Sequence, residues 1–418
     1  MTGAGLWFWV AGGIVSCAGP SADDVGKETG DTPDTGIEVV DDTGPIDTDE
    51  TGDTDETDDT GSDDELEYAA FFDVLEVQRI DLEISEEGLA ALRADPDTYV
   101  EAVFVHDEDR VEEVGVRLKG GTSTFEDIDG KPSFKVKLDE FVSGQDYGGL
   151  DRVNLHNMKA DPSQAREVLA AAMWEGAGLV APRANYAEVY VNGALYGLYA
   201  NVEEVDDAFV ERRWPGGAGD LWEAGNDADL TPAGILNYSS AAGIGDDDAL
   251  DLARRAVQTG EGAFYEVADG VLDMAQFLDF WAWQIATGNE DGYPYELDDH
   301  YLFADPEKEG RFAYVPWGLD ETWNSEFEWD DYGGTVAVHC RYDTACAALL
   351  NERVAAALTT YEGLDVNVLA QAAFDVSAAA IDADTRRYVS AAEVLSARSA
   401  LVNLAVARPG VVRGQMGL

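Results

Sequence analysis

Carboxylates and aromatic residues alternate over residues 281–323 in a pattern suited to cation binding and phosphoryl chemistry. An apolar, helix-compatible run breaks at Gly288, and the loop beyond it carries Asp291 and Asp299. Two short strand-like runs follow, and another carboxylate, Asp320, comes directly after the second run. Magnesium prefers oxygen ligands and takes few of them from protein. In phosphoryl transfer, one further carboxylate orients the attacking hydroxyl. Because carboxylates among Trp, Tyr and Phe are costly to bury unless paired or metal-bound, this stretch predicts a metal-dependent site.

A few lysines form the second set of candidates. Lys135 and Lys137 alternate with apolar residues over 133–138, and a loop rich in Gly, Ser and Thr precedes them at 120–125. A strand that presents lysines beside such a loop can clamp a phosphate, since loop amides approach the anion and lysine neutralises it. Two alternatives stay open: the lysines form a solvated strand face, and in a chain with 85 acidic residues the loop aspartates are surface groups.

The overall charge excludes one class of partner. Acidic residues number 85 against 26 Lys and Arg, which gives a formal net charge of −59. Nucleic-acid binding requires clustered Lys and Arg, so we expect no DNA or RNA partner. An anionic nucleotide can bind such a chain only through a local basic cluster together with a divalent cation.

The N-terminal residues predict export. The apolar run 6–18 is too short to cross a bilayer but suits the apolar region of a signal peptide. Residues 14–17 resemble a bacterial lipobox, which makes Cys17 the expected lipidated residue of a membrane-anchored envelope lipoprotein; an ordinary cleaved signal peptide is the alternative. We therefore assign 1–17 to a signal peptide. Residues 18–66, rich in Asp, Thr and Gly, are expected to be a disordered acidic linker.

Export also bears on the remaining cysteines. Cys340 and Cys346 are six residues apart, close enough to form a local disulfide, which an exported protein favours. The alternative is a zinc site that includes His339. Without a second cysteine pair nearby, the disulfide is our prediction.

The remaining residues, 67–418, predict an α+β domain. Strands are expected at 77–84, 99–106, 111–119, 131–138, 186–191 and 195–202, with helices after Ser85 and Asp161. A Gly/Asp-rich connection covers 215–248, and helical periodicity dominates 249–285 and 345–407. A sheet-rich N-lobe (67–214) followed by a mostly helical C-lobe (215–418) is typical of two-lobed kinase-like folds rather than of sandwich or barrel enzymes.

Several sequence blocks carry a family resemblance. They are VGVRLKGGTSTF, KPSFKVKL, NMKADPSQAREVLAAAMWEGAG, ANYAEVYVNGALYGLYANVEE, GNEDGY and VPWGLDETW. In this order the chain resembles the CotH kinase family, named for a bacterial spore coat protein, in its exported lipoprotein form. The resemblance implies an atypical protein kinase that uses ATP with Mg²⁺ or Mn²⁺ to phosphorylate Ser or Thr of a protein acceptor. The only membrane contact expected is through the N-terminal lipid.

The same resemblance implies residue roles. Asp291 matches the catalytic aspartate, and Asp320 and Asp299 match metal ligands. Lys135, with Lys137 as the alternate, matches the phosphate-contacting lysine, and Glu203 matches a glutamate that pairs with that lysine or with the metal.

Two departures from the family pattern matter. Many members have Asp where Gly318 stands and Asn near Asp299, so a non-catalytic scaffold or adhesin that retains the fold is the alternative function. A carbohydrate hydrolase that uses Asp291 with Asp320 or Glu203 is a third.

Overall fold

The computed structural model describes residues 68–418 apart from 122, 215, 218 and 259–262, and these belong to one compact unit, Asp58–Leu418. The predicted signal peptide, the lipidation site Cys17 and the acidic linker lie outside the described residues. The strands are β1 (Val77–Ile84), β2 (Val100–His106), β3 (Asp109–Lys119), β4 (Ser133–Lys137), β5 (Arg152–His156), β6 (Ala184–Val191), β7 (Ala194–Glu203), β8 (Leu221–Ala224), β9 (Tyr238–Ala242), β10 (His300–Asp305) and β11 (Arg311–Pro316). The helices are α2 (Glu86–Ala94), α3 (Arg166–Gly176), α4 (Asp207–Arg213), α5 (Asp247–Gln258), α6 (Phe264–Ala268), α7 (Met274–Thr287), α8 (Thr335–Tyr342), α9 (Thr344–Gly363), α10 (Val366–Ala383) and α11 (Ala391–Met416), with short 3-10 turns η1 (Gly234–Asn237), η2 (Pro306–Lys308) and η3 (Leu319–Glu321).

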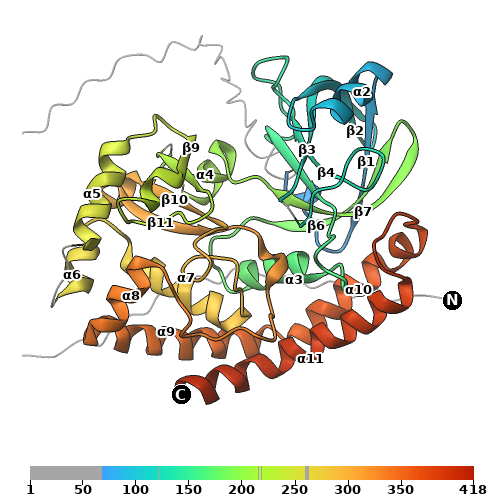
Figure 1. Ribbon diagram of the computed structural model, residues 1–418. Helices are drawn as coiled ribbons and strands as arrows, with labels where there is room; N and C mark the ends of the chain where they lie inside the picture. Colours follow the sequence, from blue (N-terminus) through green and yellow to red (C-terminus); the bar gives the residue numbers. More distant parts are fainter. Residues whose placement is uncertain (1–67, 122, 215, 218, 259–262) are drawn as a thin grey trace, which may run out of the picture. The chain divides into compact units, whose positions relative to one another are not determined.

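Within the described residues, seven strands close into a barrel in the order β1-β2-β3-β4-β5-β7-β6 (Figure 1). Alternating apolar residues fill its interior, among them Ile80, Leu82 and Val136, each fully buried. The sequence predicted antiparallel strands here but neither β5 nor the closure. Closure depends on the parallel pairing of β1 with β6, in which Ile80 lies opposite Val189. Local patterns carry no information about such a long-range pairing.

A four-stranded sheet, in the order β11-β10-β8-β9, lies next to the helices (Figure 1). Its β10–β11 hairpin confirms the two strand-like runs expected near 301–303 and 312–317. The strands β8 and β9 correct the prediction that 215–248 is only a connection. They are four and five residues long and contribute the buried Leu221 and Trp222, a signal too short to separate from a loop by periodicity.

The helix α7 is the centre of the helical part. Its N-terminus is capped by Asp273, whose side chain accepts a hydrogen bond from the backbone N–H of Gln276, and it ends at Gly288 in the left-handed conformation. Apolar residues occur all around the helix, and most of its residues are buried. The rings of Phe280 and Trp283 pack against Trp174 of α3 with centroids 5.9 and 6.3 Å apart. A helix that is apolar on every side must be covered on every side, which α3, α9, α11 and β11 do.

The C-terminal helices are joined to the barrel by a buried ion pair. Lys131 Nζ lies 2.8 Å from Asp384 Oδ2, and the two side chains are 1% and 0% exposed. The same carboxyl oxygen accepts a hydrogen bond from the backbone N–H of Leu198 in β7. Gly197 has no side chain that would collide with this carboxyl, which lies 2.5 Å from the ideal position of a Cβ there.

Cys340 and Cys346 form a disulfide across the junction of α8 and α9, as the sequence predicted.

In the described part of the chain no single helix has the length and apolar character to cross a membrane. The helices α9 and α10, bent by 52° at their junction, meet those criteria when taken together.

We expect Asp384→Ala to lower the free energy of unfolding by about 3–5 kcal/mol, because it leaves the Lys131 ammonium buried without its partner. Urea unfolding followed by circular dichroism measures the loss. Asp382→Ala, at an exposed position in the last turn of α10, which Asp384 directly follows, is the matched control and should change stability by less than about 0.5 kcal/mol. Equal effects of the two substitutions would contradict the role of the ion pair.

Candidate functional site

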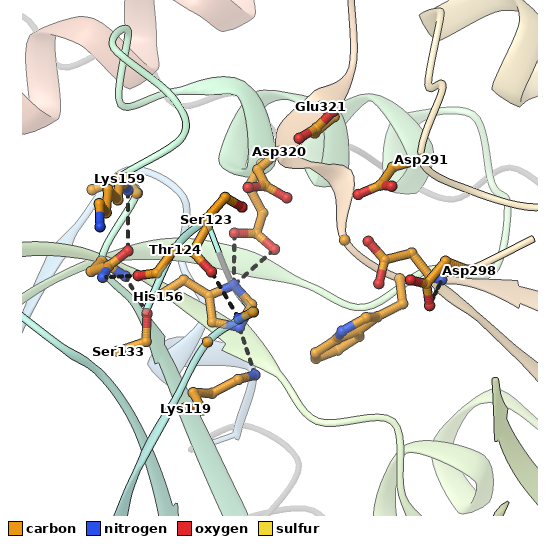
Figure 2. A pocket seen from close by; sticks show the side chains of 18 of the residues that line it. Lys119, Ser123, Thr124, Ser133, His156, Lys159, Asp291, Asp298, Asp320 and Glu321 are labelled. Carbon is orange, nitrogen blue, oxygen red and sulfur yellow. Dashed lines mark hydrogen bonds and ion pairs between the residues drawn. The ribbon is translucent and has the colours of Figure 1, made fainter. Parts of the chain in front are cut away.

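A cavity of about 340 Å³ lies between the barrel and the segments that surround the β10–β11 hairpin (Figure 2). One wall comes from the end of β3, the loop after it, and the end of β5. The opposite wall comes from the loop after α7, the start of β10 and the segment after β11. The residues that line it are Lys119, Gly120, Gly121, Ser123, Thr124, Ser133, His156, Asn157, Met158, Lys159, Glu167, Asn226, Asp291, Asp298, Asp299, Trp317, Gly318, Asp320 and Glu321.

The structure brings the three predicted aspartates to this one cavity. β10 and β11 are antiparallel with His300 opposite Pro316, so the residue before β10 and the residues after β11 lie at the same edge of the sheet. The backbone N–H of Trp317 donates to the carbonyl of Asp299 at 3.0 Å. The end of α7 is held there too, because Trp323 N donates to the Thr287 carbonyl at 2.7 Å.

The absence of a side chain at Gly318 leaves room for the carboxyl of Asp299 in the cavity wall. The ideal position of a Cβ on Gly318 lies 1.8 Å from Oδ2 of Asp299, and Gly318 has a positive φ of 54°. A side chain at position 318 therefore cannot coexist with the observed position of the Asp299 carboxyl. The carboxyl of Asp299 thus occupies space that a side chain at position 318 would need.

Asp291, Asp299 and Asp320 form the carboxyl wall of the cavity, in which acidic side chains lie close enough to repel one another. Burial, then the neighbouring carboxyls Asp291 and Asp320, raise the pKa of Asp299 well above its usual range, and Asp299 shares a hydrogen bond with Asp291. Such a bond between carboxyl groups requires that one of them carries a proton. Burial, followed by repulsion from Glu167, raises the pKa of Asp320 to about 8. Burial also raises the pKa of Asp291.

These side chains fit a hard cation that takes only part of its ligands from protein. Among the described residues, no three His, Cys, Asp or Glu side chains are arranged to hold a metal ion by themselves. Asp299 and Asp320 nevertheless line the same cavity, and magnesium is usually bound by one or two carboxylates plus water and substrate phosphate. The chemistry of this donor set, oxygen and anionic, agrees with such an ion.

The cavity wall opposite the carboxyls carries Lys119 rather than the predicted Lys135. On the barrel surface Lys119 is paired with Ser133, and Arg117 with Lys135, in the β3–β4 register. Lys119 and its partner Ser133 line the cavity. Lys135 lies two residues further along β4, on the same face, and does not line it. Successive same-face residues are about 7 Å apart, so Lys135 stands beyond the cavity wall and its Nζ donates to Glu204 Oε1 at 2.8 Å.

Two other predicted roles need correction. Glu203 pairs neither with a lysine nor with the carboxyl wall: it is 1% exposed and lies 3.1 and 3.4 Å from the guanidinium groups of Arg212 and Arg213. Adjacent residues of a strand point to opposite faces, so it is Glu204 that reaches Lys135. Lys137, the alternate, pairs with Glu140 at 2.9 Å and does not line the cavity.

Sequence reasoning missed the cavity-lining pair His156 and Glu167. His156 Nδ1 lies 2.9 Å from Glu167 Oε2, between β5 and the start of α3. Identifying β5 by its alternation would have placed His156 on the same face as Lys119. Glu167, in the first turn of α3, had no comparable signal.

Residues 116–353 match the family of CotH kinase proteins. The inner spore coat protein H of Bacillus subtilis (strain 168) is 23% identical over 224 residues, which are 51% of this chain and 61% of that protein. The invasin CotH2 of Rhizopus delemar is 23% identical over 199 residues, 43% of this chain and 34% of that protein. The chain thus spans less than two thirds of the length of the curated relatives it matches.

Among solved structures, the chain is similar to a Helicobacter pylori proinflammatory kinase, CtkA, with a TM-score of 0.32 and 11% identity, covering 71% of this chain and 95% of that one. It is also similar to a Shewanella oneidensis MR-1 toxin–antitoxin complex of HipA, HipB and operator DNA, with a TM-score of 0.30 and 12% identity, covering 81% of this chain and 74% of that one.

The raised carboxyl pKa values predict how stability depends on pH. A folded carboxyl with a raised pKa binds protons that the unfolded chain does not, so the stability of the metal-free protein falls as pH rises toward 8. Asp320→Asn removes this effect. We expect its melting temperature to exceed that of the parent protein by a margin that grows from pH 5 to pH 8, reaching roughly 2–6 °C.

Differential scanning calorimetry in the presence of a chelator measures this margin. Glu326→Gln, at an exposed position nearby, is the control and should show little change with pH. A margin for Asp320→Asn that stays constant from pH 5 to pH 8 would contradict the burial of a proton-binding carboxyl.

Proposed function

The chain belongs to the CotH kinase protein family, and from this premise we propose that it transfers the terminal phosphoryl group of ATP to Ser or Thr of a protein acceptor, with Mg²⁺ or Mn²⁺. The observation that carries the proposal is the cavity itself. Three aspartates with raised pKa values form one side of it, and a lysine and a Gly/Ser/Thr loop form the other. Such a cavity suits an anionic substrate bound together with a cation.

Asp291 is the residue we assign to the acceptor hydroxyl. It comes four residues after Thr287, the last residue of α7, and is half-buried at the cavity. Its carboxylate accepts the hydrogen bond of a Ser or Thr hydroxyl and so orients the attacking oxygen, the role that a carboxylate serves in phosphoryl transfer. The raised pKa also favours uptake of the hydroxyl proton, because a stronger base accepts it more readily.

Asp299 and Asp320 are the residues that would hold the divalent cation. When bound, the cation supplies neutralisation of the charge on the phosphates. Asp320 is fixed by its place in η3, and Asp299 by the backbone contact of its carbonyl with Trp317. Both carboxyls must lose their protons when the cation binds, so cation affinity is expected to rise with pH up to about 8.

We also propose that the protein acts outside the cytoplasm, anchored by a lipid on Cys17. The sequence of residues 14–17 supports this, and the names of two relatives describe a spore coat protein and an invasin, both consistent with a surface location. The strong negative charge argues against a nucleic-acid partner.

The second candidate function is a non-catalytic surface scaffold that retains the fold. The observation that favours it is Gly318, which supplies no carboxylate at a position where many members of the family have Asp. The hydrolase that uses Glu203 finds no support, because Glu203 is buried against two arginines away from the cavity.

We expect the purified protein to transfer labelled phosphate from ATP to itself or to a Ser/Thr-rich acceptor when Mn²⁺ is present. Asp291→Ala should reduce the rate by about 10²- to 10⁴-fold, because it removes the group that orients the hydroxyl. Asp331→Asn, at an exposed loop position, should leave the rate unchanged.

The melting temperature with ATP and Mn²⁺ separates the two candidate functions, since a bound ligand stabilises the folded state. Phosphate transfer no greater than that of Asp291→Ala rules out the kinase. Stabilisation by ATP without transfer would then favour a nucleotide-binding scaffold.

A further inference from the structure

The lysines of the described chain differ in their partners. Five of them lie within 4.0 Å of a carboxylate oxygen, namely Lys131, Lys135, Lys137, Lys159 and Lys308. Lys119 is the exception among the described residues: its Nζ donates to two neutral acceptors, Asn154 Oδ1 at 3.2 Å and His156 Nε2 at 2.9 Å. An ammonium has three N–H donors, so these contacts leave one of them for another acceptor.

The His156 ring positions the Lys119 ammonium through a hydrogen bond to its Nε2. Nε2 can accept from the ammonium only if its lone pair is free, so the ring proton must lie on Nδ1. Nδ1 then donates to Glu167 Oε2 at 2.9 Å. The ring of Trp317 also lies beside the cation, with its centroid 5.3 Å from Nζ. His156 and Glu167 thus direct the Lys119 ammonium at the cavity without neutralising it through a direct ion pair.

Lys135 lacks these properties. Its charge is matched by Glu204 at 2.8 Å, and Glu204 also accepts a hydrogen bond from Asn154 Nδ2 at 2.5 Å. Because the Asn154 amide donates to Glu204 through Nδ2, its Oδ1 is oriented toward Lys119. A continuous series of contacts therefore runs from Lys135 through Glu204 and Asn154 to the cavity-lining Lys119 (Figure 2 shows its cavity end, with Lys119 and His156).

We propose that Lys119, together with Gly120, Gly121, Ser123 and Thr124, is the subsite for the terminal phosphates of the substrate. We propose also that Lys135 and the His156–Glu167 pair are positioning residues that act through Lys119. The inference rests on the proposed function, which it deepens by assigning the phosphate contact to Lys119. The burial that lowers the pKa of Lys119 to about 8 agrees with a cation that lacks a carboxylate partner until an anion binds.

The test uses tripolyphosphate as the probe, with and without Mn²⁺, and isothermal titration calorimetry of the full domain as the readout. Lys119→Met should weaken tripolyphosphate binding on the order of 10- to 100-fold, the effect of one lost charge-assisted contact. Lys135→Met should weaken it less, and Lys137→Met, on the same strand face but paired with Glu140, is the matched control with no change. Mn²⁺ binding without the anion reports on the carboxyl wall and should persist in all three variants.

The positioning role of His156 has its own readout. His156→Gln still offers an acceptor oxygen to Lys119, whereas His156→Phe offers none. We expect the Gln variant to retain most of the tripolyphosphate affinity and the Phe variant to lose it as Lys119→Met does. Equal losses in both variants would overturn the positioning role.

The outcomes separate this inference from the proposed function. Unchanged tripolyphosphate binding in Lys119→Met, or a larger loss in Lys135→Met, overturns the assignment to Lys119 while phosphate transfer by the parent protein still supports the kinase. Failure of the parent protein to bind both tripolyphosphate and ATP with Mn²⁺ overturns the proposed function, and the inference with it.

Discussion

The site depends on the register of the β10–β11 hairpin. With His300 opposite Pro316, the chain enters β10 and leaves β11 at the same edge, which brings Asp299 and Asp320 to one cavity. A slip of one residue would turn each side chain of the shifted strand to the opposite face of the sheet. Buried apolar residues on both strands, including Tyr301, Phe303 and Val315, make such a slip costly. The packing of the sheet therefore determines where the carboxyls stand.

The two walls of the cavity carry complementary unfavourable charges. Burial and mutual repulsion raise the pKa values of the carboxyls, whereas Lys119 is half-buried and donates to neutral acceptors. A cation alone would offset the repulsion among the carboxyls, and an anion alone would offset the positive charge of Lys119. Under the proposed function, a cation and a phosphate chain bound together would offset both charges, which would favour cooperative binding of the two ligands in a chain of net charge −59.

The sequence predicted the acidic wall better than the basic one. Asp291 follows a helix end, Asp299 precedes a strand and Asp320 follows one, and a local pattern is enough to locate such positions. The choice between Lys119 and Lys135 required the register of three neighbouring strands, and one of these, β5, was not predicted. Barrel closure and the ion pair between Lys131 and Asp384 join segments far apart in the chain, so no local pattern could reveal them.

Positions 299 and 318 compete for the same space at the edge of the sheet. Gly318 supplies no carboxylate to the segment after β11, where many members of the family have Asp. The carboxyl of Asp299 occupies the space beside Gly318, with its Oδ2 only 1.8 Å from the ideal Cβ position of that glycine. Because the two segments are adjacent in the sheet, either can deliver a carboxyl to this edge. The effect of a substitution at one of the two positions is therefore interpretable only with the identity of the residue at the other.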